Sequence, residues 1–417
     1  MEVEMKAKVL CVTIIVFAIV STGVVSAQGT WTQVADMPTA RGTHTADVVN
    51  GKIYVMGGYD YNTKEVLSSV EEYDPATGIW TIKKDMPAPR FGHYSGMVNG
   101  MIYAIGGVDE DLTYGITTVE EYDPATDNWT TKAPLPTPRW AHASCELNGK
   151  IYVVGGGIGM QNPTFSGPID VYDPGTDTWT TKANMPTLRS CLSCCAVNGK
   201  IYAIGGLTPQ KLSTLGTMEE YDPETDTWTT KSPMPTPRAF LSACELRGKI
   251  YAIGGFVNES KEVLSTVEVY DPITDIWTTE NSLPVEREDF AACTHDNAIY
   301  VFGGENSGSV SFAEVYVFDI PILVEDSVPV EYTLFQNYPN PFNPVTTIRY
   351  NLYQSGMVKL VVCNVLGEKI ATLADGFETQ GSHEVIWNAC GCAGGVYFCR
   401  IESGGMEIMT RKMLLLK

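Results

Sequence analysis

Six arginines recur along the chain at nearly equal steps and are the first candidates for chemistry. They are separated by 49, 49, 50, 49 and 49 residues, and they are Arg41, Arg90, Arg139, Arg189, Arg238 and Arg287. A guanidinium binds a carboxylate through two parallel hydrogen bonds, so gathered arginines predict a site for an anionic ligand. The alternative is that each arginine solves a repeated structural problem by pairing with a strand carboxylate such as Glu71 or Glu120.

Aromatic side chains follow three of these arginines. Phe91 and Trp140 come directly after an arginine, and Phe240 lies two residues after one. Trp140 is also the only Trp between residues 28 and 320 that falls outside a regular ladder of Trp residues. Aromatic rings stack on sugars and on partner side chains, so we predict that these residues line a ligand-binding surface. Packing in the core is the alternative.

Histidines and acids raise two further possibilities. His44, His93 and His142 share one repeat position, and three imidazoles that converged could ligate a metal. Equivalent positions in separate repeats diverge, so we predict no metal. His142, the arginines and a loop acid, Asp109 or Asp111, form the acid–base set of an enzymatic alternative. The sequence indicates no catalytic residue and no cofactor, because it lacks Gly-x-Ser-x-Gly and His-Glu-x-x-His motifs.

The cysteines follow the same repetition. Cys145, Cys195, Cys244 and Cys293 are 50, 49 and 49 residues apart. One repeat position occupied by small apolar side chains predicts core packing rather than a disulfide framework.

A repeat of about 49 residues must position all these side chains. Trp residues and Gly pairs keep the step of the arginines in six copies. The Trp residues are Trp31, Trp80, Trp129, Trp179, Trp228 and Trp277, and the pairs begin at Gly57, Gly106, Gly155, Gly205, Gly254 and Gly303.

Each copy predicts four short strands. In the first copy, residues 44–49 and 52–56 flank Asn50-Gly51, a dipeptide typical of two-residue hairpins. A third strand covers residues 70–73, and a fourth begins at Trp80 after a tight turn. No room is left for a helix, and four-stranded antiparallel sheets repeated around an axis form a β-propeller. We therefore predict an all-β fold with six blades.

These motifs resemble the kelch family. The resemblance rests on Gly-Gly after an apolar strand, on Val70-Glu71-Glu72-Tyr73-Asp74-Pro75 and on a Trp a few residues later, repeated over about 290 residues. It implies a kelch propeller. Some kelch propellers are copper radical oxidases and others are sialic acid epimerases, so the resemblance also implies a carbohydrate-active enzyme as the alternative function.

The ends of the repeat array predict how the ring closes. The chain begins with a fourth-type strand at residues 31–35, whereas the last copy has no Trp of its own, so the first strand should complete the last blade. Connections between second and third strands differ freely among copies, and with the arginine segments they should form one face. Variable loops on a rigid scaffold usually carry function.

The N-terminal sequence and the net charge indicate the location of the protein and the ligands it can bind. Residues 1–27 combine Lys6, Lys8, an apolar run and a small-residue site, which predicts a signal peptide and no transmembrane segment after its cleavage. The net charge of -21 falls between Gln28 and Val330. Such acidity disfavours binding to nucleic acid.

The remaining chain predicts a separate domain. After a linker at residues 321–330, strands are expected at 347–352, 358–365, 384–387, 395–401 and 406–416, which would form a small Ig-like β-sandwich. This segment resembles the C-terminal sorting domain of the bacterial type IX secretion system. The motifs are Asn337-Tyr338-Pro339-Asn340-Pro341, Asn364-Val365-Leu366-Gly367, Gly395-Val396-Tyr397-Phe398 and the tail Lys412-Met413-Leu414-Leu415-Leu416-Lys417.

Together these observations predict a signal peptide, a propeller at 28–320, a linker and a sorting domain at 331–417. The resemblance implies recognition by the secretion machinery and passage through the periplasm of a Gram-negative bacterium to the outside or the cell surface. There we expect the propeller to bind a glycan or a surface protein through its loop face.

Overall fold

The computed structural model describes residues 29–110, 114–159, 164–209, 211–306, 310–319, 333–352, 356–378, 381–403 and 406–416. The chain divides into two compact units, Met1–Pro321 and Ile322–Lys417, and each unit has its own core. Every regular element in these ranges is a β-strand, which confirms the all-β fold class. The predicted signal peptide and the predicted linker lie outside the described residues.

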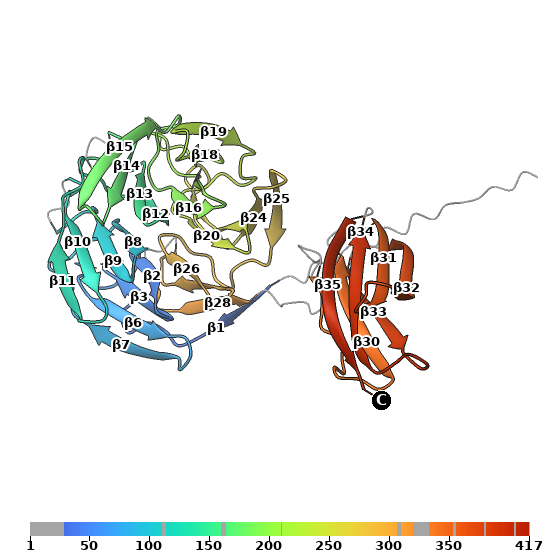
Figure 1. The fold of residues 1–417 in the computed structure, drawn as a ribbon. Helices are drawn as coiled ribbons and strands as arrows, with labels where there is room; N and C mark the ends of the chain where they lie inside the picture. Colours follow the sequence, from blue (N-terminus) through green and yellow to red (C-terminus); the bar gives the residue numbers. More distant parts are fainter. Residues whose placement is uncertain are drawn as a thin grey trace, which may run out of the picture. The chain divides into compact units, whose positions relative to one another are not determined.

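Strands of the first unit form six four-stranded antiparallel sheets around one axis (Figure 1). The first three sheets are β2 (Thr45–Val49), β3 (Lys52–Met56), β6 (Val70–Asp74) and β7 (Ile79–Lys83); β8 (Tyr94–Val98), β9 (Met101–Ile105), β10 (Val119–Asp123) and β11 (Asn128–Thr131); and β12 (Ala143–Leu147), β13 (Lys150–Val154), β14 (Pro168–Asp173) and β15 (Thr178–Asn184).

The other three sheets follow the same order. They are β16 (Ser193–Val197), β17 (Lys200–Ile204), β18 (Met218–Asp222) and β19 (Thr227–Lys231); β20 (Ser242–Leu246), β21 (Lys249–Ile253), β24 (Val267–Asp271) and β25 (Ile276–Glu280); and β26 (Ala291–His295), β27 (Ala298–Phe302), β28 (Val315–Asp319) and β1 (Thr30–Gln33). Two loops add the hairpins β4 (Tyr59–Asp60) with β5 (Glu65–Val66), and β22 (Phe256–Val257) with β23 (Glu262–Val263). The arrangement is compatible with the six blades that the repeats predict.

Local chemistry explains the strands. Asn50 and Gly51 have φ of 50° and 77°, as a type I′ hairpin between β2 and β3 requires. Strand β3 is buried from Ile53 to Met56, because it lies inside its blade and packs on both faces. First strands of successive blades contact one another around the axis.

The first described strand closes the ring. Strand β1 pairs with β28 of the last blade, with Trp31 opposite Phe318 and their ring centroids 4.7 Å apart. The prediction that an N-terminal strand completes the final blade is confirmed. The blades therefore form a closed cycle although the chain is linear.

The Gly pairs bring neighbouring blades into contact. In each blade the second Gly donates its N–H to the carbonyl of the arginine in the next blade, at 2.8–3.0 Å. The first Gly lies against the same carbonyl: a Cβ on Gly106, where φ is +59°, would lie 2.6 Å from the oxygen of Arg139. Glycine and arginine therefore recur together because their backbones meet between blades.

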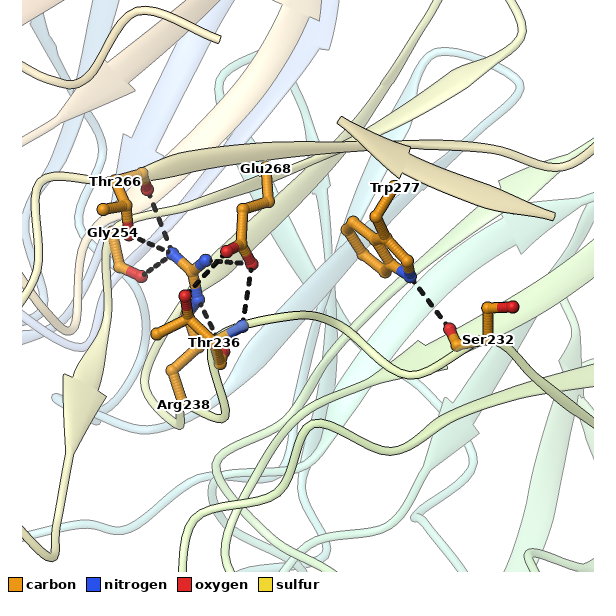
Figure 2. Close-up of polar contacts among 7 residues, drawn as sticks. All are labelled: Ser232, Thr236, Arg238, Gly254, Thr266, Glu268 and Trp277. Carbon is orange, nitrogen blue, oxygen red and sulfur yellow. Dashed lines mark hydrogen bonds and ion pairs between the residues drawn. The ribbon is translucent and has the colours of Figure 1, made fainter. Parts of the chain in front are cut away.

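The Trp ladder supplies a second contact between blades. Trp277 donates its Nε1–H to the carbonyl of Ser232 in the preceding blade, at 2.8 Å (Figure 2). Four other Trp residues of the ladder make the equivalent bond, whereas Nε1 of Trp228 has no partner in the described part of the chain.

The second unit has two sheets. One contains β29 (Thr333–Leu334), β30 (Val345–Leu352) and β33 (Gly381–Asn388), and the other contains β32 (Lys369–Glu378), β31 (Gly356–Asn364), β34 (Gly395–Ser403) and β35 (Met406–Leu415). Ile348, Leu360, Trp387 and Met413 share one core, which is compatible with the predicted sandwich. Strand β32 was not predicted.

Candidate functional site

A closed ring of backbone hydrogen bonds surrounds the propeller axis. Each blade contributes the residue two positions after its arginine, and its N–H donates to the carbonyl of the equivalent residue in the preceding blade at 2.6–3.1 Å. The last bond runs from Thr43 to Asp289 and completes the cycle. The six ring residues are Thr43, Gly92, Ala141, Cys191, Phe240 and Asp289.

The ring forces an unusual backbone on all six residues. Their φ angles lie between 48° and 57°, in the left-handed region that residues with a Cβ rarely adopt. Each non-glycine residue there costs roughly 1–2 kcal/mol. Because the conformation recurs in every blade whatever the side chain, it belongs to the scaffold, and only the identity of the side chains distinguishes one blade from another.

The loops begin beside this ring. The residue directly after each arginine forms an antiparallel bridge with the residue after the Gly pair: Gly42 with Tyr59, Phe91 with Val108, Trp140 with Gly157, Ser190 with Leu207, Ala239 with Phe256, and Glu288 with Glu305. We call the ring residues and these twelve bridge residues the mouth.

The mouth contains a cavity of about 60 Å³. Phe91, Trp140 and Phe240 all line it, so the structure brings together the three aromatic residues that the sequence singled out. His93 and the acidic Asp289 share the lining. A second cavity of about 270 Å³ is lined by the first strands of the blades, farther along the axis.

The arginines do not reach the mouth surface. All six side chains are 0% exposed. Arg238 shows the arrangement in Figure 2: its guanidinium pairs with Glu268 and donates to the carbonyls of Gly254 and Thr266, each at 3.0 Å. A guanidinium in such a position cannot touch a ligand unless its blade opens.

The same pairing recurs in four other blades. The partners are Glu71 for Arg41, Glu120 for Arg90, Asp170 for Arg139 and Glu219 for Arg189. In the sixth blade, Arg287 lies over the rings of Phe312 and Tyr316, with its Cζ 5.0 and 4.9 Å from their centroids. The structure therefore replaces the ligand-binding interpretation of the arginines with the structural one.

The histidines are also interior. His44, His93 and His142 are 6%, 1% and 0% exposed, and the equivalent positions in the other blades hold Leu192, Leu241 and Phe290. Burial, followed by the charge of Arg139, lowers the pKa of His142 to about 3. Burial also holds the pKa values of His44 and His93 well below the ordinary range, so all three are neutral near pH 7. Among the described residues, no group of His, Cys, Asp and Glu is arranged to hold a metal ion.

Blade six brings three carboxyl groups together at the mouth. Glu288 and Glu305 face each other across their bridge, and Asp289 is a ring residue. Asp289, Glu305 and Tyr61 of blade one are close enough to influence one another's pKa values. Two neighbouring carboxylates repel each other, so such a pair favours a state in which one of them is protonated.

Burial raises the pKa values of all three groups, and neighbouring carboxylates raise those of Glu288 and Asp289 further. For Glu288, burial and then the charge of Glu305 raise the pKa to about 7. For Asp289, burial and the charges of Glu288 and Glu305 raise the pKa well above its ordinary value, and burial raises that of Glu305. Such perturbed carboxyls are more frequent at functional sites than elsewhere.

Internal comparison could have found this acidic group. Only the sixth copy has acids at the two positions after the arginine; the other copies read Gly-Thr, Phe-Gly, Trp-Ala, Ser-Cys and Ala-Phe there. Of the predicted loop acids, Asp109 is half-buried and does not line the cavity, whereas Asp111 lies outside the described residues.

Comparisons with known proteins support the assignment of both units. The profile of the KLHDC2/KLHL20/DRC7 Kelch-repeats domain matches residues 16–157 and 131–281, the Kelch motif matches 286–321, and the Secretion system C-terminal sorting domain matches 336–415. No curated protein gives a significant match.

Among solved structures, the one described as the structure of YjhT aligns with a TM-score of 0.61 and 16% identity, covering 70% of this chain and 98% of that chain. At this identity the likeness shows the fold alone. No helix in the described ranges is long and apolar enough to cross a membrane.

The buried arginine pairs predict a large effect on stability. Arg238→Leu leaves the carboxylate of Glu268 buried without its counter-charge, so we expect a loss of about 3–5 kcal/mol in the free energy of unfolding. Replacing both residues by Leu should recover part of that loss. Urea unfolding measures both variants, and a single-variant loss no larger than that of an exposed substitution contradicts the structural role.

The acidic group predicts a pH-dependent stability. The pKa of Glu288 is raised in the folded protein from about 4.5 to about 7, so the folded state holds the extra proton and loses stability as the pH rises between these values. Glu288→Gln removes that loss. We expect its melting temperature to exceed that of the wild type by more at pH 8 than at pH 5, with exposed Glu286→Gln as the control. An equal difference at both pH values argues against the raised pKa.

Proposed function

Because the chain belongs to the kelch-repeat family and ends in a secretion-system sorting domain, we propose that it is an exported binding protein whose ligand docks at the mouth. The ligand is a surface polysaccharide or a surface protein. One observation carries the proposal: the mouth is aromatic at Phe91, Trp140 and Phe240 but acidic at blade six, on a scaffold that is otherwise repeated.

The size of the cavity favours binding of a large ligand. Small-molecule sites usually have volumes of roughly 300–1,000 Å³, whereas the mouth cavity has about 60 Å³. A ligand can insert only a tip there, and the rest of it would lie over the loops. This geometry suits a polymer or a protein better than a small substrate.

A second candidate function is carbohydrate-active catalysis. The observation that favours it is the neighbouring pair of Asp289 and Glu305, because burial raises the pKa of both carboxyls and a raised pKa suits a general acid. The acid–base set with His142 and the arginines loses support, since these side chains are buried. Conversion of a bound glycan to product, lost in Asp289→Asn, favours the enzyme; an unchanged glycan favours binding.

We assign export to the second unit. The sorting domain indicates a secreted or cell-surface protein. In our proposal, type IX machinery recognises residues 331–417 in the periplasm and carries the propeller across the outer membrane.

The binding proposal predicts a loss of affinity on removal of one aromatic ring. A glycan array and surface cross-linking, both with the mature full-length chain, should identify a ligand whose affinity falls at least tenfold in Trp140→Ala. Ile273→Ala, an 86% exposed residue in a turn remote from the mouth, is the matched control. Thermal melting checks that both variants fold. Equal binding by both variants contradicts docking at the mouth.

The export proposal predicts the fate of a truncated chain. Deletion of residues 331–417 should leave a folded propeller in the periplasm, since the recognised domain is gone. Cell fractionation and immunoblotting measure its location, with the full chain as control. Truncated protein that still reaches the medium or the cell surface refutes the assignment.

A further inference from the structure

We propose that the mouth cavity binds the side-chain ammonium of a lysine presented by a partner protein. This inference rests on the proposed binding function and specifies its ligand. It is carried by the chemistry of the cavity lining, by its size and shape, and by buried polar atoms that lack partners.

The lining includes hydrogen-bond acceptors beside its apolar side chains. It holds the carboxyl of Asp289, the neutral imidazoles of His44 and His93 and the hydroxyl of Thr43, but neither Lys nor Arg among its described residues. Glu288 and Glu305, which form a backbone bridge with each other, are the acidic neighbours of Asp289. A lining of this kind fits a ligand that donates hydrogen bonds and carries positive charge.

His93 is a second observation, independent of the acids, because one of its ring nitrogens lacks a hydrogen-bond partner. Its side chain is 1% exposed, and its Nδ1 has no hydrogen-bond partner within the described part of the chain. With the proton on Nε2, which faces the hydroxyl of Thr45 at 3.5 Å, Nδ1 is free to accept. A buried polar atom without a partner requires an explanation, and His93 is one of the residues that line the cavity.

The size and walls of the cavity select the form of the cation. About 60 Å³ admits a slender group, and three aromatic residues, Phe91, Trp140 and Phe240, share the lining with Asp289. Aromatic faces attract ammonium groups and pack on alkyl chains. A lysine tip is narrow, apolar along its stem and charged at its end, whereas an amino sugar carries its amine on a wide ring. The cavity therefore favours the protein ligand.

The net negative charge of the chain also favours a cationic ligand. The propeller segment, residues 28–320, carries a net charge of -19, so a partner that presents lysines is drawn toward it. Attraction of this kind is general, and the local arrangement of acceptors must supply the specificity.

Binding should depend on pH through the acidic group. Titratable groups around Glu288 are Asp289 on its own segment, Glu305 across the bridge, Tyr61 from blade one and the thiol of Cys191 from blade four. Burial raises the pKa of the Cys191 thiol, so it stays neutral in this pH range. Ionisation of Glu288 near pH 7 adds a negative charge beside the ammonium, whose own charge does not change below pH 9. Affinity should therefore rise from pH 6 to pH 8.

Fluorescence anisotropy with the mature full-length protein tests the proposal. The probe is a labelled Gly-Gly-Lys-Gly-Gly peptide, and the matched ligand is the same peptide with Nε-acetyl-lysine. We expect the acetylated peptide to bind at least tenfold more weakly. The same loss is expected for the probe with the double variant Glu288→Gln, Asp289→Asn, which keeps the shape of both side chains.

A charge control separates the site from general attraction. Asp296→Asn removes an acid whose side chain is 87% exposed in a hairpin turn remote from the mouth, and it should leave affinity unchanged. Equal binding of the two peptides, an equal loss in Asp296→Asn, or no binding up to millimolar peptide overturns the lysine inference. If a glycan or protein still binds in a Trp140-dependent manner, the proposed function survives that result; if nothing binds at the mouth, both fail.

Discussion

The rest of the propeller depends on how six separate blades hold one axis together. Two cycles of backbone hydrogen bonds do this: the ring residues bond to one another, and the second Gly of each pair bonds to the arginine carbonyl of the next blade. Both cycles use backbone atoms of a short segment around each arginine. The sequence of that segment is therefore constrained at its arginine and free at the two residues that follow.

This division explains why repeated residues and functional residues differ. The arginine guanidinium neutralises a carboxylate from its blade's third strand, at Glu71 or Glu268 for example, and satisfies carbonyls that would otherwise be buried without partners. The side chains of the ring residues and the bridge residues do not have this structural role. Trp140 fits opposite Gly157, where a Cβ would lie 2.9 Å from its Nε1, and Glu288 lies opposite Glu305. The side chains of the mouth therefore differ from blade to blade, while the backbone that carries them is the same in every blade.

The sequence predicted the fold well because its signals were repeated. Asn50-Gly51, the Gly pairs and the Trp ladder each appear at a regular step, and the closing role of the strand at Trp31 followed from the missing Trp in the last copy. Strand β32 was missed, since Gly376 and two acids interrupt its apolar pattern and only its pairing with β31 defines it as a strand.

The aromatic half of the mouth was predicted from Phe91, Trp140 and Phe240. The acidic half was not, because the side-chain contact of Asp289 with Glu305 depends on which residues the ring and the bridge bring together. For the arginines, the sequence offered two roles, and burial decided between them.

The central claim is that the ring residues form a continuous hydrogen-bonded cycle that fixes the mouth side chains. Amide hydrogen exchange resolved to single residues in the free full-length protein tests this most directly. The account predicts that the amides of Thr43, Ala141, Cys191, Phe240 and Asp289 exchange as slowly as those of the buried strand β3, since opening any one of them requires separation of two blades. Exchange of these amides at the rate of exposed loop residues would contradict it.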